Sequence, residues 1–252
     1  MKTKTKIRTI LIAAICVSFT IIDLNGQSLQ SMSAIPQIGD KAPAFSANST
    51  EGEINFPQDF FGKWKILFSH PAAYTPVCTS ELIKLTSMQE EFEKLNCQVV
   101  GISTDNMENL IKWLDSIREL AGENGTDGAF NIPMISDEKM DISRKYGMVR
   151  ITEGGIHPIR ALYIIGPQDK VRAAFYYPFE NGRNFDEVKR TLLAIQKTDR
   201  FSVLTPENWN PGDDLLMYST SNEKETNRLK RMERRGVIDC DPDYFYCIRS
   251  SR

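Results

Sequence analysis

The chain has 252 residues, 41% of them hydrophobic and 25% charged, which excludes disorder throughout and predicts a soluble globular protein with one sizeable core and an appendage. Its 31 Lys and Arg are balanced by 33 Asp and Glu, giving a formal charge of -2. Because no excess of positive charge is available to hold a polyanion, we expect no nucleic-acid partner.

The first 27 residues have the pattern of an export signal. Four positive residues (Lys2, Lys4, Lys6 and Arg8) precede an apolar run at 10–22, and small and polar residues follow at 25–28. The run is shorter than the roughly 20 residues that a membrane-spanning helix needs. We therefore expect a cleaved leader, a periplasmic or secreted protein, and no membrane contact after cleavage. An uncleaved leader acting as a membrane anchor and a lipidated Cys16 are the alternatives.

Strands and helices alternate along residues 36–197, which we interpret as one domain. The run 65–69 is short, apolar and bounded by Gly62 and Pro71, as in a buried strand. Apolar residues then recur every three or four positions, as on one face of a helix. In chain order we predict a strand at 65–69, a helix at 79–96, a strand at 98–103, a helix around 110–122, a strand at 133–136, a hairpin at 161–165 and 171–177, and a helix at 184–197. This order predicts an α/β protein with a thioredoxin-like fold and a mixed central sheet.

Residues 198–252 differ in character from this domain. They contain a turn-rich stretch at 205–212, a charged stretch at 219–235 and an aromatic stretch at 244–246. We expect so polar a segment to build no core of its own, and either to stay unfolded or to pack on a neighbour. We favour a C-terminal arm that wraps a second subunit and makes a homodimer.

Four cysteines remain after the leader: Cys78, Cys97, Cys240 and Cys247. They form no Cys-x-x-Cys pair, and the chain has only two histidines, so neither a zinc site nor a thioredoxin-type dithiol is expected. We also predict no other metal and no cofactor. Cys97 opens a predicted strand and is interpreted as a core residue.

Cys78 is the candidate nucleophile because it lies at the predicted start of a helix. Unpaired backbone N–H groups and the helix dipole stabilise a thiolate there. Thr75, three residues upstream, can place a hydroxyl beside the sulfur, and Pro71 and Pro76 stiffen the loop. The alternative, a buried cysteine that only packs, does not account for these neighbours.

The pattern Pro71-x-x-x-Thr75-x-x-Cys78 resembles the active-site motif of the peroxiredoxins, the AhpC/TSA family. Residues 68–71 (Phe-Ser-His-Pro) with 75–79 (Thr-Pro-Val-Cys-Thr) are similar to its one-cysteine, or peroxiredoxin-6-like, branch. The resemblance continues at 160–167, 177–178, 182–187, 205–209 and 212–213, and so covers about residues 38–218.

The resemblance implies a thiol peroxidase in which Cys78 attacks a hydroperoxide. Thr75 would hydrogen-bond the substrate and the thiolate, and Arg160 would hold its guanidinium near the sulfur. The other implied roles are shielding of the sulfenic acid by Pro71, anchoring of the arginines by Glu81, support of that anchor by Arg183, and a place beside the pocket for His70. Phospholipid hydrolysis, known in this branch, is not predicted, because Gly62-Lys63-Trp64 lacks the serine.

The C-terminal cysteines resemble those of archaeal and bacterial relatives that recycle through such residues. In that reading Cys247 resolves the sulfenic acid of Cys78, and Cys240 then exchanges with Cys247. A local Cys240–Cys247 disulfide that staples the arm is the alternative.

The expected substrates are hydrogen peroxide and organic hydroperoxides, and the expected reductant is a thioredoxin-like or other thiol protein. The family further implies antioxidant defence and a homodimer or a decamer of dimers. A cytoplasmic location, as in most relatives, is the alternative to export.

Two other functions are the alternatives to a peroxidase. A thiol-disulfide oxidoreductase would need the Cys-x-x-Cys that is missing, and a non-catalytic holdase would not need Thr75 and Arg160 around Cys78.

Overall fold

The computed structural model describes residues 35–123, 130–219, 222–240 and 246–248. The predicted leader, residues 1–27, lies outside the described residues, as do Tyr244 and Phe245 of the aromatic stretch. None of the helices within the described ranges combines the length and the apolar character that crossing a membrane requires.

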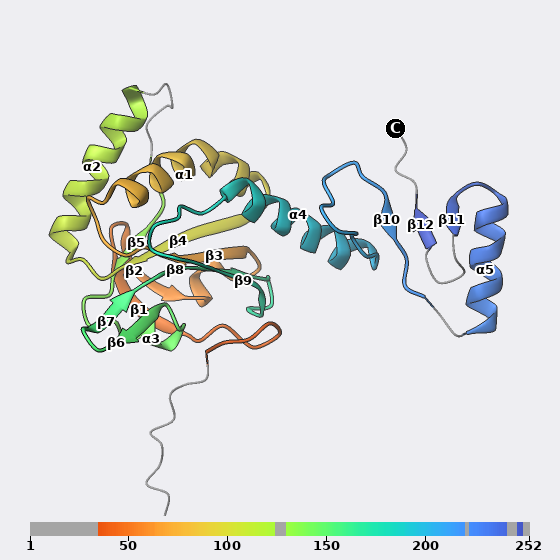
Figure 1. The fold of residues 1–252 in the computed structure, drawn as a ribbon, viewed down its shortest axis with the longest axis horizontal. Coiled ribbons are helices and arrows are strands. Elements are labelled where there is room, and N and C mark those ends of the chain that lie inside the picture. The colour runs from red at the N-terminus through yellow and green to blue at the C-terminus, as the bar shows by residue number, and fades with distance from the viewer. Residues whose placement is uncertain (1–34, 124–129, 220–221, 241–245, 249–252) are drawn as a thin grey trace, which may run out of the picture. The chain divides into compact units, whose positions relative to one another are not determined.

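A mixed sheet forms the centre of the domain (Figure 1). Within the described residues it has seven strands in the order β2-β1-β5-β4-β3-β8-β9. β3, β4 and β5 pair in parallel, and the other neighbours pair antiparallel. The strands are β1 (Phe45–Ser49), β2 (Gly52–Phe56), β3 (Trp64–Ser69), β4 (Cys97–Ser103), β5 (Met134–Ser136), β8 (Arg160–Ile165) and β9 (Val171–Tyr177). The predicted thioredoxin-like fold with a mixed sheet is therefore confirmed.

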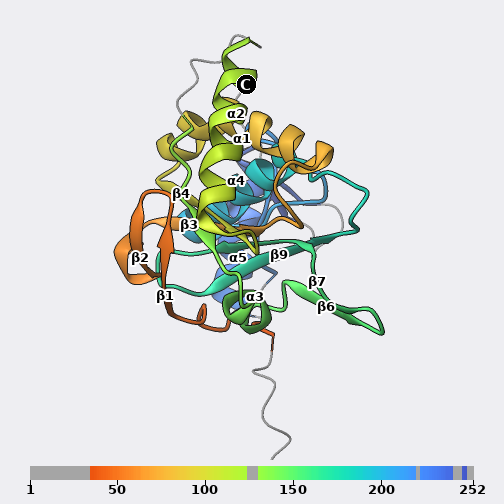
Figure 2. The same ribbon diagram turned by 90° about the vertical axis from the view of Figure 1, so that its left-hand side faces the viewer.

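Helices cover both faces of this sheet (Figures 1 and 2). α1 (Pro76–Lys94), α2 (Met107–Glu123) and α4 (Phe185–Phe201) pack on one face, and the short α3 (Asp141–Lys145) packs on the other. Side chains along a strand alternate between faces, so Ile66 and Phe68 join the first core and Leu67 the second. This two-sided burial explains why the central strands are continuous apolar runs.

α1 and α4 extend beyond their predicted limits. α1 begins at Pro76 rather than at 79, because proline at the first helical position needs no N–H partner and has a suitable φ. The earlier start places Cys78 at the third helical position. α4 continues to Phe201, four residues past its predicted end.

Several short elements were missed by the sequence reading. They are the β1–β2 hairpin, the single-turn η1 (Gln58–Phe60), α3, and the hairpin of β6 (Val149–Thr152) and β7 (Gly155–Pro158). Each is short, and the hairpin strands outside the core are mostly half-buried or exposed, so no strong hydrophobic period marks them.

The C-terminal region contains β10 (Leu215–Leu216), α5 (Glu223–Arg234), β11 (Ile238–Cys240) and β12 (Tyr246–Ile248). The three strands pair in the order β10-β12-β11. Leu229 of α5 and Ile238 of β11 are buried at 1% exposure, in a cluster completed by Met217, Met232 and Ile248. The expectation that this segment is too polar to build a core was therefore wrong, because a few spaced apolar residues suffice for a small one. Its embrace of a second subunit stays a prediction.

Candidate active site

The start of α1 presents Cys78 to the interior of the domain. Thr75 is the N-cap, with extended backbone, and Pro76 opens the helix. The Thr75 hydroxyl donates to the carbonyl of Ala72 at 2.9 Å. Because this bond uses its proton, the hydroxyl oxygen keeps lone pairs that can accept a hydrogen bond from a peroxide. Cys78 itself is 0% exposed.

Arg160, the first residue of β8, meets Cys78 from the sheet. Its Nη1 lies 3.1 Å from Cys78 Sγ and 3.0 Å from Glu81 Oε2, and its Nε donates to the carbonyl of Phe179 at 3.0 Å. The Phe179 ring also lies against this guanidinium, 5.8 Å from centroid to Cζ. The arginine is 1% exposed, so these partners fix its direction. A guanidinium so placed stabilises negative charge on the sulfur.

Glu81 follows Cys78 by three residues on α1 and holds both arginines. Arg183 donates to its carboxylate from Nε at 3.0 Å and from Nη2 at 2.6 Å, and the Arg183 backbone N–H adds a bond of 2.8 Å. Nη1 of Arg183 donates to the carbonyls of Ser69 and Ala161. Buried charges are tolerated when they are paired and hydrogen-bonded as fully as these are. The cluster therefore ties the cysteine helix to β3 and β8.

His70 directly follows β3, in the loop that leads to the cysteine helix. It is buried, and its ring centroid is 5.0 Å from that of Trp113. Burial, aided by the positive charge of Arg183, lowers the pKa of His70 from 6.5 to about 4, against the opposing pull of Asp105 and Glu81. Its imidazole is therefore neutral at pH 7, and its place is beside the site rather than on the sulfur.

This lowered pKa predicts a loss of stability in mild acid. The unfolded chain takes up the His70 proton below about pH 6.5, whereas the folded chain resists it until about pH 4, so this contribution to stability is present above pH 6.5 and lost as the pH falls. Between pH 7 and pH 5 the free energy of unfolding should fall by about 2 kcal/mol more in the wild type than in His70→Gln. Urea unfolding of both proteins at the two pH values measures this; an equal fall in both would contradict it.

The remaining predicted residues occupy different places. Pro71 is buried directly after His70, at the edge of the loop. Cys97 is buried in β4, as expected of a core residue, and burial raises the pKa of its thiol. In the C-terminal sheet the register sets Cys247 opposite Asp239 and Cys240 opposite Tyr246, so the two cysteines are not directly across from one another.

Two groups in the site were not found by sequence reasoning. The Phe179 carbonyl that accepts from Arg160 is backbone, and residue type does not mark it. Asp105 accepts from the backbone N–H of Ala73 at 2.8 Å and from the Ser103 hydroxyl at 2.6 Å, and so holds the loop before Cys78. Its position just past the carboxyl end of β4, where parallel sheets place functional groups, could have signalled it.

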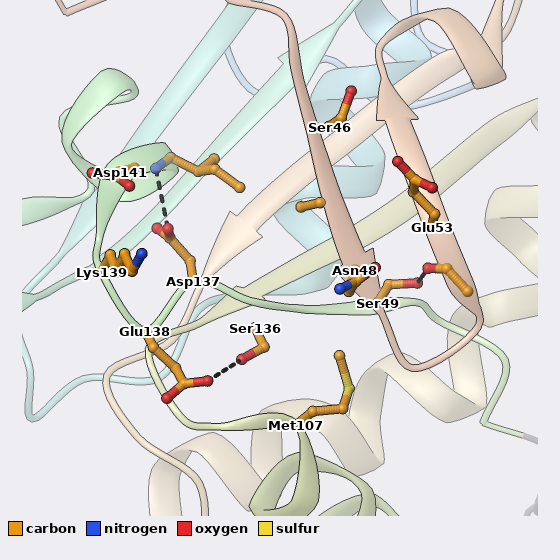
Figure 3. A pocket seen from close by; sticks show the side chains of 13 residues that line it. Ser46, Asn48, Ser49, Glu53, Met107, Ser136, Asp137, Glu138, Lys139 and Asp141 are labelled. Carbon is orange, nitrogen blue, oxygen red and sulfur yellow. Dashed lines mark hydrogen bonds between the residues drawn. The ribbon is translucent and has the colours of Figure 1, made fainter.

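A separate cavity of about 610 Å³ lies between the β1–β2 hairpin and the start of α3 (Figure 3). It contains none of the predicted site residues. Its carboxylate Asp137 is occupied, because it accepts from the backbone N–H groups of Ile142 at 3.2 Å and Ser143 at 2.7 Å. This cavity is thus built around a helix start, and none of the Cys78 site residues lines it.

Comparisons with known proteins find matches over most of the chain. Residues 38–174 match the AhpC/TSA family, and residues 194–231 match the C-terminal domain of 1-Cys peroxiredoxin. A peroxiredoxin of Methanosarcina mazei is 42% identical over 216 residues, which cover 85% of this chain and 98% of that protein. A yeast mitochondrial 1-Cys peroxiredoxin has a TM-score of 0.74 at 33% identity, with 85% and 99% of the two chains covered. A mutant of peroxiredoxin 6 of Arenicola marina has a TM-score of 0.75 at 29% identity, with 86% and 99% covered.

Proposed function

Because the chain belongs to the AhpC/TSA family of peroxiredoxins, which are peroxidases, we propose that it reduces hydrogen peroxide and organic hydroperoxides with Cys78 as the peroxidatic nucleophile. The observation that carries this proposal is the buried contact of 3.1 Å from Arg160 Nη1 to Cys78 Sγ, held in place by Glu81. A cysteine that only packs in a core does not need an arginine aimed at its sulfur.

In the proposed reaction the Cys78 thiolate attacks the terminal oxygen of the hydroperoxide. An S–O bond forms, the O–O bond breaks, and the sulfur loses two electrons to become a sulfenic acid. The other oxygen leaves with the electron pair and takes a proton, as water or an alcohol. Arg160 stabilises the negative charge that moves from sulfur to the leaving oxygen, and Thr75 accepts a hydrogen bond from the substrate.

For recycling, we assign Cys247 as the thiol that condenses with the sulfenic acid and releases water. Cys78 is fully buried, so a second cysteine does not reach its sulfur while the first turn of α1 is closed. A disulfide needs Cα atoms about 4.4–6.8 Å apart, and this turn therefore has to open for the bond to form. The long separation along the chain favours a bond between two subunits. Cys240 would then exchange with Cys247 and pass the disulfide to a thioredoxin-like or other thiol reductant. We propose that the protein is exported and acts in antioxidant defence.

Cys247→Ser should abolish the covalent dimer that peroxide produces. Wild type treated with one equivalent of hydrogen peroxide is expected to run at twice the chain mass on non-reducing gels, whereas the variant stays at monomer mass after reacting once. Further peroxide should then carry Cys78 of the variant to the sulfinic acid. Cys240→Ser is the matched control and should still give the dimer.

Peptide mapping of the untreated protein separates this proposal from a structural role of the arm. A Cys240–Cys247 bond present before peroxide is added, with no dimer afterwards, would make the arm a local staple. The enzyme would then be a one-cysteine peroxidase that uses an external thiol.

A further inference from the structure

The segment 179–183, which lies between β9 and α4, is tied to the Cys78 site at both ends (Figure 1). At its start the Phe179 carbonyl accepts the hydrogen bond from Arg160 Nε at 3.0 Å. At its end Arg183 is 7% exposed and donates to the Glu81 carboxylate through both its backbone N–H and its guanidinium. Only three residues connect these two anchors, so a change in the length of their backbone has to move one anchor or the other.

The middle of this segment is an Asn-Gly pair, Asn181-Gly182, and both residues are exposed. Asn181 donates its backbone N–H to the carbonyl of Pro178 at 3.2 Å, whereas in the described part of the chain its side-chain amide makes no hydrogen bond. Glycine has no Cβ, so the Gly182 backbone nitrogen is unshielded and the chain can bend into a five-membered ring. The pair therefore has the exposure and the freedom that closure of a succinimide ring needs.

We propose that Asn181-Gly182 is a site of spontaneous deamidation, and that isoaspartate at position 181 slows the reaction of Cys78 by displacing Arg183 from Glu81. The Gly182 nitrogen attacks Cγ of Asn181, an N–C bond forms, and the side-chain amide leaves as ammonia with the proton of the Gly182 N–H. Water then opens the ring at either carbonyl, which gives aspartate or isoaspartate. No electrons are transferred, and water is the only co-reactant.

Isoaspartate lengthens the segment between its two anchors. Its main chain runs through the former side chain and gains one carbon–carbon bond, about 1.5 Å. Arg183 holds Glu81, and Glu81 in turn accepts from Arg160 Nη1 at 3.0 Å, the atom that lies 3.1 Å from Cys78 Sγ. A shift of Arg183 therefore passes to the guanidinium that stabilises the thiolate, and a misplacement of about 1 Å can cost about 10²-fold in rate. This effect on rate rests on the proposed function, whereas the deamidation itself does not.

The test follows the ageing of the purified wild type at neutral pH over several weeks. A small thiol and exclusion of oxygen keep Cys78 reduced, and the thiol is removed before each assay. Peptide mapping measures aspartate and isoaspartate at position 181, and stopped-flow fluorescence measures oxidation of Cys78 by hydrogen peroxide. A second phase, about 10²-fold slower than the first, should grow in step with the isoaspartate at position 181.

Three variants separate the causes of this slow phase. Asn181→Gln keeps the amide but would have to close a six-membered ring, so it should show the fast phase alone throughout. Asn124→Gln removes the other Asn-Gly pair that follows the predicted leader, and as the matched control it should develop the slow phase as the wild type does. Asn181→Asp has the added charge without the added backbone bond, and when freshly purified it should react at close to the wild-type rate.

Aged wild type without isoaspartate at position 181, or with isoaspartate there and an undiminished fast phase, would overturn the inference. A slow phase in aged Asn181→Gln would do the same. Freshly purified Asn181→Asp that is already slow would show that charge, rather than displacement of Arg183, is the cause. The rate of the fresh wild type tests the proposed peroxidase function separately, because peptide mapping reads the deamidation whether or not Cys78 reacts.

Discussion

Replacing Cys78 with serine is expected to abolish peroxide consumption while the fold is kept. The change alters one atom of a buried side chain, and the hydroxyl that replaces the thiol is far too weak an acid to supply the nucleophile at neutral pH. The arginines keep Glu81 as a partner, so the cluster that ties α1 to the sheet remains. The test measures the consumption of hydrogen peroxide by the variant in a coupled or direct assay. Far-UV circular dichroism shows whether the variant is folded.

Cys97→Ser is the matched control. Cys97 is also buried, but it lies in β4 and its thiol has a raised pKa, so it should take no part in the reaction. That variant should retain the peroxidase rate, at a cost of about 1–3 kcal/mol in stability for burying a hydroxyl. Substantial turnover by Cys78→Ser would refute the assignment of the nucleophile.

Arg160→Met should slow the attack on peroxide by about 10²- to 10³-fold, the usual cost of removing a preorganised donor from a developing anion. Methionine fills similar space but donates no hydrogen bond to the sulfur or the leaving oxygen. Glu81 keeps its three bonds from Arg183, which limits the structural damage. The measurement is the second-order rate constant for oxidation of Cys78 by hydrogen peroxide.

Arg172→Met provides the comparison for this variant. Arg172 lies on β9, the strand that pairs with the Arg160 strand β8. It is partly exposed and pairs with Asp199, away from the sulfur. Its loss should leave the rate constant near that of the wild type. If Arg160→Met also reacts at the wild-type rate, the contact of 3.1 Å is structural and does not serve catalysis.

The parts of the fold that sequence predicted well are those with a strong hydrophobic period. β3 is largely apolar on both of its faces, and α1 has apolar residues at every third or fourth position. The structure buries these residues. The β6–β7 hairpin, by contrast, holds Arg150 and His157 on an exposed face, and its strands are four residues long, so its pattern is too weak to detect. The C-terminal core was missed because only a few apolar positions build it.

The candidate site was predictable to the extent that it is local in sequence. Cys78, Thr75 and Pro71 lie in one loop, and their spacing already indicates a nucleophile at a helix start. Arg160 is 82 residues away, and its residue type alone suggests a solvated surface arginine. Only the family resemblance placed it, because contacts between distant segments depend on strand pairing that a single sequence does not specify.

The pairing of Glu81 with two arginines also sets an electrostatic condition on the catalytic cycle. With Cys78 as a thiolate, the four side chains of Cys78, Glu81, Arg160 and Arg183 carry two negative and two positive charges, and the sum is zero. Formation of a neutral sulfenic acid leaves one positive charge without a counterpart in a region that excludes water. An uncompensated buried charge is costly, so the oxidised site gains by ionising to the sulfenate or by opening to solvent. Under the proposed mechanism we therefore expect the residues that keep the reduced site closed to destabilise its oxidised form, so that the reaction itself favours opening of the first turn of α1.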